Sequence, residues 1–285
     1  MRMDGWRGLA GSCIKTNTHN ELEAVAARAR IKTLLWAGAR RVVHRFPGWR
    51  SQRVGSGMLQ LHSDLFANLR RLGGYIHPAV QAVATDGQGT GLKIVGEPIQ
   101  PGQIIIGVPP PLQLSWASSS PTLGIASAVE QLLPDDEQWD MRCAVALLAL
   151  EATAARSGDA YWQAYLDTLP DRVPGLPANF ASAELRQVGR RYPALPSAVA
   201  ARAHFVRSLA DALQLPAPLL GRAYSMVTSR AFSIDGVGAP GCLLPLIDLA
   251  NHAFEPSASV IRLTEGLGCG SAHAHARPLH LTPDT

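Results

Sequence analysis

The chain has 285 residues and a mass of 30.4 kDa, and its 47% apolar and 17% charged residues are typical of a folded globular protein. The longest stretch without a charged residue, 98–129, contains six prolines, which excludes a membrane-spanning helix there. The four cysteines are far apart and form no C-x-x-C pair. The sequence therefore indicates neither a disulfide framework nor a zinc site, and it predicts a reducing compartment.

Positive charge is concentrated in residues 1–60, which contain nine Arg and two Lys against Asp4, Glu21 and Glu23. The rest of the chain is slightly acidic, so a basic patch for nucleic acid is excluded outside this segment, and we expect no nucleic-acid partner. The composition of residues 1–60 suits a transit peptide or a disordered leader equally well.

Residues 65–76 predict a short helix closed by Gly73 and Gly74, and residues 80–84 then alternate as in a strand. Further short strands are predicted at 92–95 and 103–109, with Gly87, Gly89 and Gly91 forming a turn between the first two. The turn is not a dinucleotide loop, because a strand follows it instead of the helix that would face the pyrophosphate.

The pattern becomes helical after Ser115. We predict a buried helix at 139–156 and a second helix at 160–168 ended by Pro170, followed by a helix at 182–191 with Ser182 as N-cap. Prolines near the first turn open two more helices, at 196–214 and 218–232.

Four polar residues, Arg230, Asp248, Asn251 and His252, surround the apolar segment 243–250. Polar groups beside a buried segment need partners or a ligand. On residue types alone, Arg230 could clamp a carboxylate, while Asn251 and His252 could bind a heterocycle through hydrogen bonds. The alternative is that Arg230 and Asp248 form a structural pair and that His252 is an ordinary turn residue.

Four segments in order resemble the SET-domain methyltransferases of the subgroup that includes the Rubisco large-subunit lysine methyltransferase and the actin-histidine methyltransferase. They are GQGTGLKIVGEPIQPGQIIIGVP, SGDAYWQAYLDTLP, VTSRAF and LLPLIDLANHAFEPSA, within residues 65–259. The resemblance implies an α+β SET fold over residues 61–259, with small β-sheets interrupted by a helical insert at about 118–220.

The resemblance implies S-adenosylmethionine as cofactor and a protein side chain as substrate, with lysine the expected acceptor and histidine the alternative. Carried over to this sequence, Gly89, Gly91 and Leu92 would offer backbone to the cofactor, and Arg230 would pair with its carboxylate. Asn251 and His252 would hold the amino and adenine groups, and Phe232 would border the acceptor channel. No metal is implied, and the protein is expected to be a monomer outside the membrane.

The sequence departs from the family after Ser259. The family's G-E-x-x-x-x-x-Y-G segment, whose tyrosine lies beside the transferred methyl group, has no counterpart, because no tyrosine follows Tyr224. The catalytic residue is therefore unknown, and the SET fold is expected to be incomplete at its C-terminal end. We expect either a truncated version of an active enzyme or an inactive SET-like module that binds cofactor or a partner.

Residues 260–285 form an atypical tail with no strand or helix signal. Its Cys269, His273, His275 and His280 match no common zinc spacing, so a disordered or out-of-frame tail is expected. The basic leader and the Rubisco-related subgroup together predict a plastid location, with cytoplasm or nucleus as alternatives.

Overall fold

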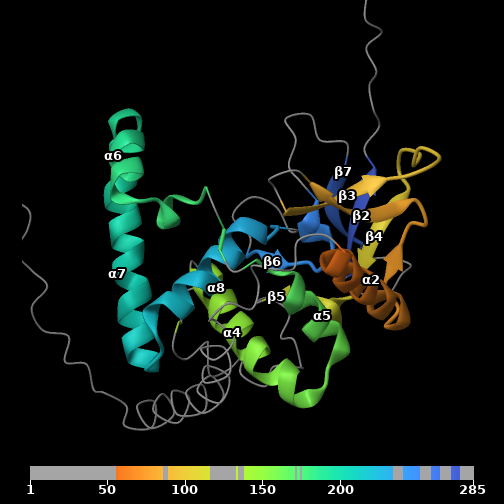
Figure 1. The fold of residues 1–285 in the computed structure, drawn as a ribbon, viewed down its shortest axis with the longest axis horizontal. Coiled ribbons are helices and arrows are strands. Elements are labelled where there is room, and N and C mark those ends of the chain that lie inside the picture. The colour runs from red at the N-terminus through yellow and green to blue at the C-terminus, as the bar shows by residue number, and fades with distance from the viewer. Residues whose placement is uncertain are drawn as a thin grey trace, which may run out of the picture.

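The computed structural model describes residues 56–85, 89–115, 133, 138–170, 172–173, 175–233, 240–250, 258–263 and 271–276. Within these residues, small antiparallel sheets lie to one side of the molecule, and most of the helices extend away from them (Figure 1). The chain forms its early strands, then runs through a series of helices and returns to the sheets. This element order agrees with the predicted α+β arrangement.

The largest described sheet has four strands in the order β1-β4-β8-β7, with every neighbouring pair antiparallel. These strands are β1 (Tyr75–Ile76), β4 (Ile104–Val108), β8 (Ser271–Ala276) and β7 (Ala258–Leu263). Ile106 of β4 pairs with Ile76 on one side and with Ala274 on the other. Its side chain and that of Val108 are buried, so β4 connects the sheet to the core.

The structure corrects the expectation that residues 260–285 contain no regular element. Residues 271–276 form β8, which lies between β4 and β7 and pairs with both. The pattern SAHAHA gives no sequence signal because it lacks the branched and aromatic residues typical of strands. Pairing on both sides supplies backbone hydrogen bonds that do not depend on those side chains.

A hairpin of β2 (Val80–Thr85) and β3 (Gly89–Ile94) forms a second sheet. Strands β2 and β3 confirm two of the predicted strands, but Gly89 and Gly91 are not turn residues. They lie within β3, where Gly91 pairs with Val83, and Gly87 lies outside the described residues. A third pair, β5 (Leu114–Ser115) with β6 (Cys242–Leu243), connects the two ends of the helical region.

The predicted helix at 139–156 is confirmed as α4 (Trp139–Ser157), and its residues 140–150 are all buried. A helix that is apolar on every side is stable only inside a core, and α4 packs against α8 (Ala217–Arg230) and α5 (Ala160–Thr168). Asp159 caps α5 by accepting hydrogen bonds from the backbone N–H groups of Tyr161 and Trp162, at 3.1 Å each.

The helices α6 (Ser182–Arg191) and α7 (Leu195–Leu213) form an arm beside the rest of the helical region (Figure 1). The N-cap of α6 is Ala181 and not Ser182, because Glu184 reaches back to accept the Ala181 N–H at 2.6 Å. No residue of α6 is buried, and the buried residues of α7 all lie at or after Val206.

Helix α2 (Ser56–Arg71) covers the sheets through Leu65 and Leu69, which are fully buried. It ends at Arg71, and Gly73, two residues later, has a φ of 85° in the left-handed region that glycine adopts most easily. The core is continuous from α2 and β4 through α4 and α5 to α8. Among the described helices, none combines the length and the apolar character that a membrane span requires.

Candidate functional site

Arg230, Phe232 and Asp248 lie where α8, β6 and the single turn η4 (Ile247–Leu249) follow one another. Arg230 is the last residue of α8. Two residues later, the backbone of Phe232 forms a bridge with Cys242, with N to O distances of 2.9 and 3.0 Å. This bridge fixes the direction in which the chain leaves α8, and therefore fixes Arg230 relative to η4.

Arg230 contacts Asp248 of η4 in two ways, both through its Nη1 atom. Nη1 donates to the backbone oxygen of Asp248 at 3.2 Å and to its carboxylate Oδ2 at 3.4 Å. The Asp248 side chain is fully buried, whereas 18% of the Arg230 side chain is exposed. The pair considered as the structural alternative is therefore present, and it holds the guanidinium of Arg230 at the edge of the site.

A third residue, Tyr165 of α5, completes this group. Its hydroxyl donates a hydrogen bond to Oδ2 of Asp248 at 2.9 Å. Tyr165 is itself fully buried and packs edge-on against Trp162, with ring centroids 6.1 Å apart. Because one carboxylate oxygen accepts from both Tyr165 and Arg230, helix α5 is connected to the end of α8 through η4.

The protonation of Asp248 is set by opposing effects. Burial removes the carboxylate from water and raises its pKa, while the Arg230 charge and the Tyr165 hydrogen bond act in the opposite direction without cancelling the effect of burial. Burial, together with the nearby Asp248 charge, raises the pKa of Tyr165 well above its usual value. Tyr165 therefore remains a protonated hydroxyl that can only donate to the carboxylate.

Asp248 has a second carboxylate oxygen, Oδ1, which is buried and accepts no hydrogen bond from any described residue. A buried acceptor without a donor is costly, and native proteins seldom leave one without a ligand or a partner. Oδ1 is therefore a buried acceptor for which the described residues supply no donor.

The local backbone that presents Asp248 is unusual. Leu246 has a φ of 73°, which is rare for a residue with a branched side chain and costs about 1–3 kcal/mol. The turn that contains Leu246 is closed by a hydrogen bond from the Asp248 N–H to the oxygen of Leu244 at 3.0 Å. Leu243 and Leu244 are fully buried, so core packing holds the strained turn in place.

Strand β3 contacts η4, which brings the predicted glycine segment to the same place. Gly91 is buried, and Leu92 is half-buried and packs on the core. Strand β3 and Arg230 thus both contact η4, while Asn251 and His252 lie outside the described residues.

The role of Tyr165 is not predicted by the sequence, in which this residue is only one part of a motif of the helical insert. The available signal was that a tyrosine within a buried apolar helix needs a partner for its hydroxyl. The neighbouring Tyr161 follows the same rule, because its hydroxyl donates to the oxygen of Leu112 at 2.9 Å. No group of three or more potential metal-ligating side chains occurs among the described residues.

No protein-family model matches the sequence, and no curated protein matches it either. Two solved structures of the SET domain of LSMT, bound to AdoHcy with lysine or with methyllysine, are similar in structure. The first has a TM-score of 0.56 and 18% identity, and the match covers 79% of this chain and 51% of that one. The second has a TM-score of 0.55 and 16% identity, with coverage of 76% and 53%.

The chain spans about half the length of these two structures. At this level of identity, the similarity concerns the arrangement of elements, and it agrees with the strand, helix and strand order described above. The prediction of an α+β fold with small sheets and a helical insert is confirmed: the chain has the fold of a SET domain.

Proposed function

We propose that this chain is an S-adenosylmethionine-dependent protein methyltransferase of the SET type, with a lysine side chain as acceptor. The observation that carries the proposal is the position of Arg230, which is held by Asp248 at the end of α8 within a SET fold. The structural neighbours are bound to AdoHcy and to lysine or methyllysine, which supports the same cofactor and acceptor class here.

The described residues suit the amino-acid end of this cofactor. The guanidinium of Arg230 uses only Nη1 for its contacts with described residues, so Nη2 and Nε remain to bind a carboxylate. Oδ1 of Asp248 is a buried acceptor with no described donor, and a cofactor ammonium would supply one. An arginine beside a free carboxylate oxygen thus matches the two opposite charges of an amino acid.

The backbone of Gly89, Gly91 and Leu92 on β3 is proposed to lie along the cofactor, since β3 contacts η4. Asn251 and His252 are proposed to hold its amino and adenine groups, and Phe232 to border the acceptor channel. The cofactor would supply a sulfonium methyl group, to which the neutral acceptor nitrogen would form a bond as the methyl–sulfur bond breaks, so that the electron pair of the broken bond stays on sulfur and AdoHcy leaves. The protein contributes by alignment and by excluding water.

A lysine acceptor must lose its proton before it attacks, because only the neutral amine has a free electron pair. An apolar channel favours that form by disfavouring the charged one. Phe232, which is half-buried and packs on the core, is the described residue proposed for the wall of this channel.

The location in a plastid stays a prediction from the basic residues 1–60.

A second candidate function is cofactor binding without methyl transfer. It is favoured by one observation, the lack of any tyrosine among residues 225–285. A histidine acceptor is a further alternative to lysine within the enzyme proposal. These alternatives differ in whether a methyl group leaves the cofactor and in which side chain receives it.

Calorimetry of the whole chain with S-adenosylmethionine and with AdoHcy tests the proposal. We expect both to bind, and we expect Arg230→Ala to weaken binding by about 2–4 kcal/mol, because the cofactor carboxylate loses its charged partner. Arg222→Ala is the matched control, since Arg222 lies on the same helix and also pairs with an acid, Glu151, at 2.6 Å. Equal affinity of the Arg230 variant and the control would return Arg230 to a structural role.

Methyl transfer is then measured with labelled S-adenosylmethionine and a mixture of lysine-containing and histidine-containing peptides. Label recovered on lysine after hydrolysis supports the enzyme proposal. Label recovered on histidine would show that histidine, and not lysine, is the acceptor. Cofactor binding with no label on any peptide or protein would favour the second candidate function.

A further inference from the structure

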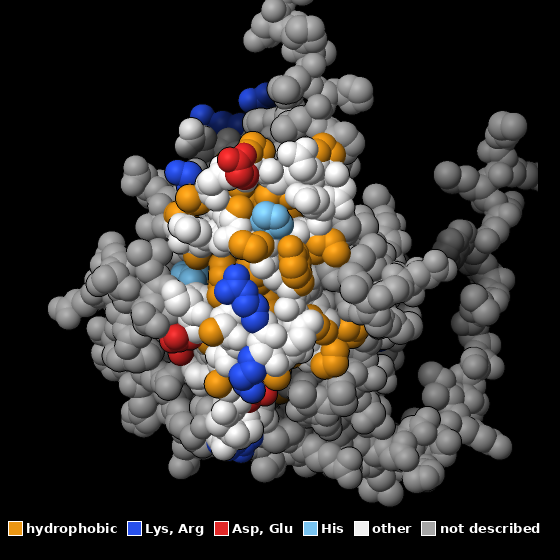
Figure 2. All heavy atoms as spheres, turned by 90° about the vertical axis from the view of Figure 1, so that its right-hand side faces the viewer, with side chains coloured by type: hydrophobic (Ala, Val, Ile, Leu, Met, Phe, Trp, Pro, Cys, Tyr) orange, Lys and Arg blue, Asp and Glu red, His pale blue; other side chains and the backbone are white. Residues whose placement is uncertain are grey.

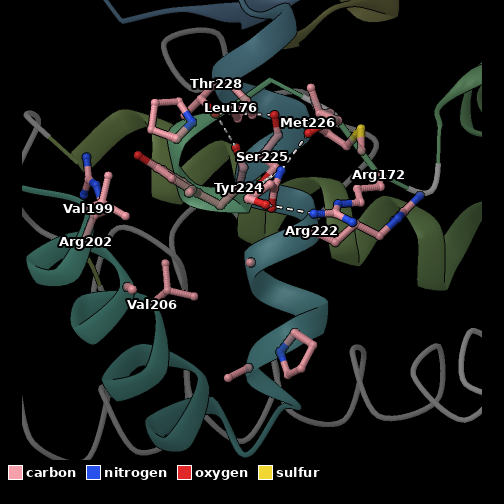
Figure 3. Close-up of a pocket in the computed structure, with 18 of the residues that line it drawn as sticks. Arg172, Leu176, Val199, Arg202, Val206, Arg222, Tyr224, Ser225, Met226 and Thr228 are labelled. Atoms are coloured by element: carbon pink, nitrogen blue, oxygen red, sulfur yellow. Dashed lines mark hydrogen bonds between the residues drawn. The ribbon is translucent and has the colours of Figure 1, made fainter. Parts of the chain in front are cut away.

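A groove of about 760 Å³ lies outside the proposed methyl-transfer site, between α7, α8 and the segment that contains η3 (Pro177–Asn179). Figure 3 shows Val199 and Val206 on α7 to one side of α8, with Leu176 near the top of the view and Arg172 on the other side of α8. This volume is within the range of natural ligand pockets and can hold several side chains.

The α7 wall of the groove is apolar and poorly covered. Residues 195–205 have the sequence LPSAVAARAHF, and no side chain among them is buried. The buried side chains of α7 all lie at or after Val206, and its first half contacts the body through Phe205 and the ion pair of Arg202 with Asp140. A helix that leaves an apolar face uncovered on an otherwise well-packed molecule marks an interaction surface.

The charge on the groove has one sign. Four arginines line it and no aspartate or glutamate does: Arg172, Arg202, Arg207 and Arg222. Two of them are already neutralised by acids of α4, Arg202 by Asp140 at 2.7 Å and Arg222 by Glu151 at 2.6 Å.

The other two arginines have no acidic partner among the described residues. Arg172 donates only to the backbone oxygen of Asn179, at 2.8 Å, and Arg207 is exposed. The groove therefore combines the apolar α7 wall with two positive charges that are available for pairing. An occupant that matches both features has apolar side chains and carboxylates.

We propose that this groove docks an acidic, amphipathic segment of another protein, whose apolar side chains enter between α7 and α8 and whose carboxylates pair with Arg172 and Arg207. Residues 1–60 of this chain do not suit the role, because their strong positive charge would repel the same arginines. The proposal does not depend on methyl transfer, since none of the groove residues belongs to the proposed cofactor site.

The test uses the whole chain and two fluorescent peptides of about 18 residues, roughly five helical turns. Both have leucines along one face, and the opposite face has glutamates in the first peptide and lysines in the second. We expect the acidic peptide to bind at least about tenfold more tightly than the basic one, because only its charges complement the groove. Binding is measured by fluorescence anisotropy.

Variants then locate the binding surface. Arg207→Glu should weaken the acidic peptide about tenfold, by removing one attraction and adding one repulsion, whereas Arg70→Glu on the exposed face of α2 should not. Ala203→Trp should abolish binding by filling the groove that Ala203 lines. Ala200→Trp is its matched control, because Ala200 is exposed on the same helix and does not line the groove.

Three results would overturn the proposal. The first is that neither peptide binds, and the second is that both bind equally. The third is that Ala203→Trp and Ala200→Trp act alike on peptide binding. Sedimentation of the whole chain supplies a further check, since a dimer that Ala203→Trp dissociates would show that the occupant is a second copy of this chain.

Discussion

Asp248 connects three elements through one side chain, and its protonation depends on how each of them is packed. It is fully buried, and its Oδ2 atom accepts from Tyr165 at 2.9 Å and from Arg230 at 3.4 Å. The longer contact is to the charged group and the shorter one to the neutral hydroxyl. The tyrosine therefore contributes to holding the carboxylate as directly as the arginine does.

The raised pKa of Asp248 predicts a specific pH dependence of folding. The folded state holds this proton more tightly than the unfolded state, so the contribution of Asp248 to stability falls as pH rises above the ordinary value of 3.8. The fall continues until the pH passes the pKa of the folded state, and the contribution is constant above that. The variant Asp248→Asn lacks this dependence.

Urea unfolding of the natural chain and of Asp248→Asn at a series of pH values above 3.8 measures this pH dependence. The free energy of unfolding of the natural chain, minus that of Asp248→Asn, should decrease with pH and then level off. A difference that rises with pH would show that Arg230 outweighs burial and that the pKa of this carboxyl is lowered in the folded protein.

Tyr165→Phe is expected to destabilise the protein by about 1–3 kcal/mol, because a buried carboxylate oxygen loses a donor. Tyr161→Phe, the matched control, removes a hydroxyl of similar burial that donates to the neutral oxygen of Leu112 at 2.9 Å, and it should cost about 0.5–1.5 kcal/mol. Denaturant unfolding compares the two. A larger loss for Tyr161→Phe would show that the Asp248 contact is the weaker one.

At the scale of elements, local patterns were sufficient where each helix or strand is determined by its own residues. The apolar run at 139–156 and the prolines near residues 196 and 218 predicted α4, α7 and α8 because these signals are local in the chain. The prediction of β8 failed because its stability comes from pairing with β4 and β7 and not from its own side chains.

The candidate site shows the same limit. The pair of Arg230 and Asp248 was the structural alternative considered from the sequence, because both are polar residues beside one apolar segment. Tyr165 lies 83 residues from Asp248, and no feature of either segment indicates the other. Only the packing of α5 near η4 makes the third member of the group visible. The resemblance to a known family supplied the overall fold, which no local pattern in this sequence could.

Gly241 lies at a tightly packed junction between α4 and β6. A Cβ atom added to Gly241 would lie 2.6 Å from Cη2 of the Trp139 ring and 3.2 Å from Cβ of Ala231. Gly241→Ala should therefore destabilise the fold by about 1–3 kcal/mol, because the rigid ring and the backbone must both move.

Gly221→Ala is the control for this prediction. The new Cβ would meet only Val206, at 3.9 Å, and alanine is favoured over glycine within a helix, so we expect a gain of about 0.5–1 kcal/mol. Thermal unfolding of both variants measures whether each substitution lowers or raises the stability of the protein. A Gly241→Ala variant as stable as Gly221→Ala would mean that Trp139 has room to turn aside.

At the scale of the whole molecule, the first and last parts of the described chain are held together by one sheet. Strand β4 comes from the start of the fold, and β8 comes from near the end of the described residues and separates β4 from β7. Ala274 pairs with Ile106 on one side and with Val260 on the other. The integrity of the fold is therefore expected to depend on residues whose sequence gives no sign of structure.

Ala274→Pro tests this dependence directly. Proline has no N–H and is excluded from the middle of a sheet, so the variant should lose about 1–3 kcal/mol of stability in denaturant unfolding. Ala274→Val is the matched control, because valine keeps the N–H and favours strands. Its free energy of unfolding should equal that of the natural chain. If the free energy of unfolding of Ala274→Pro also equalled that of the natural chain, residues 271–276 would not belong to the sheet.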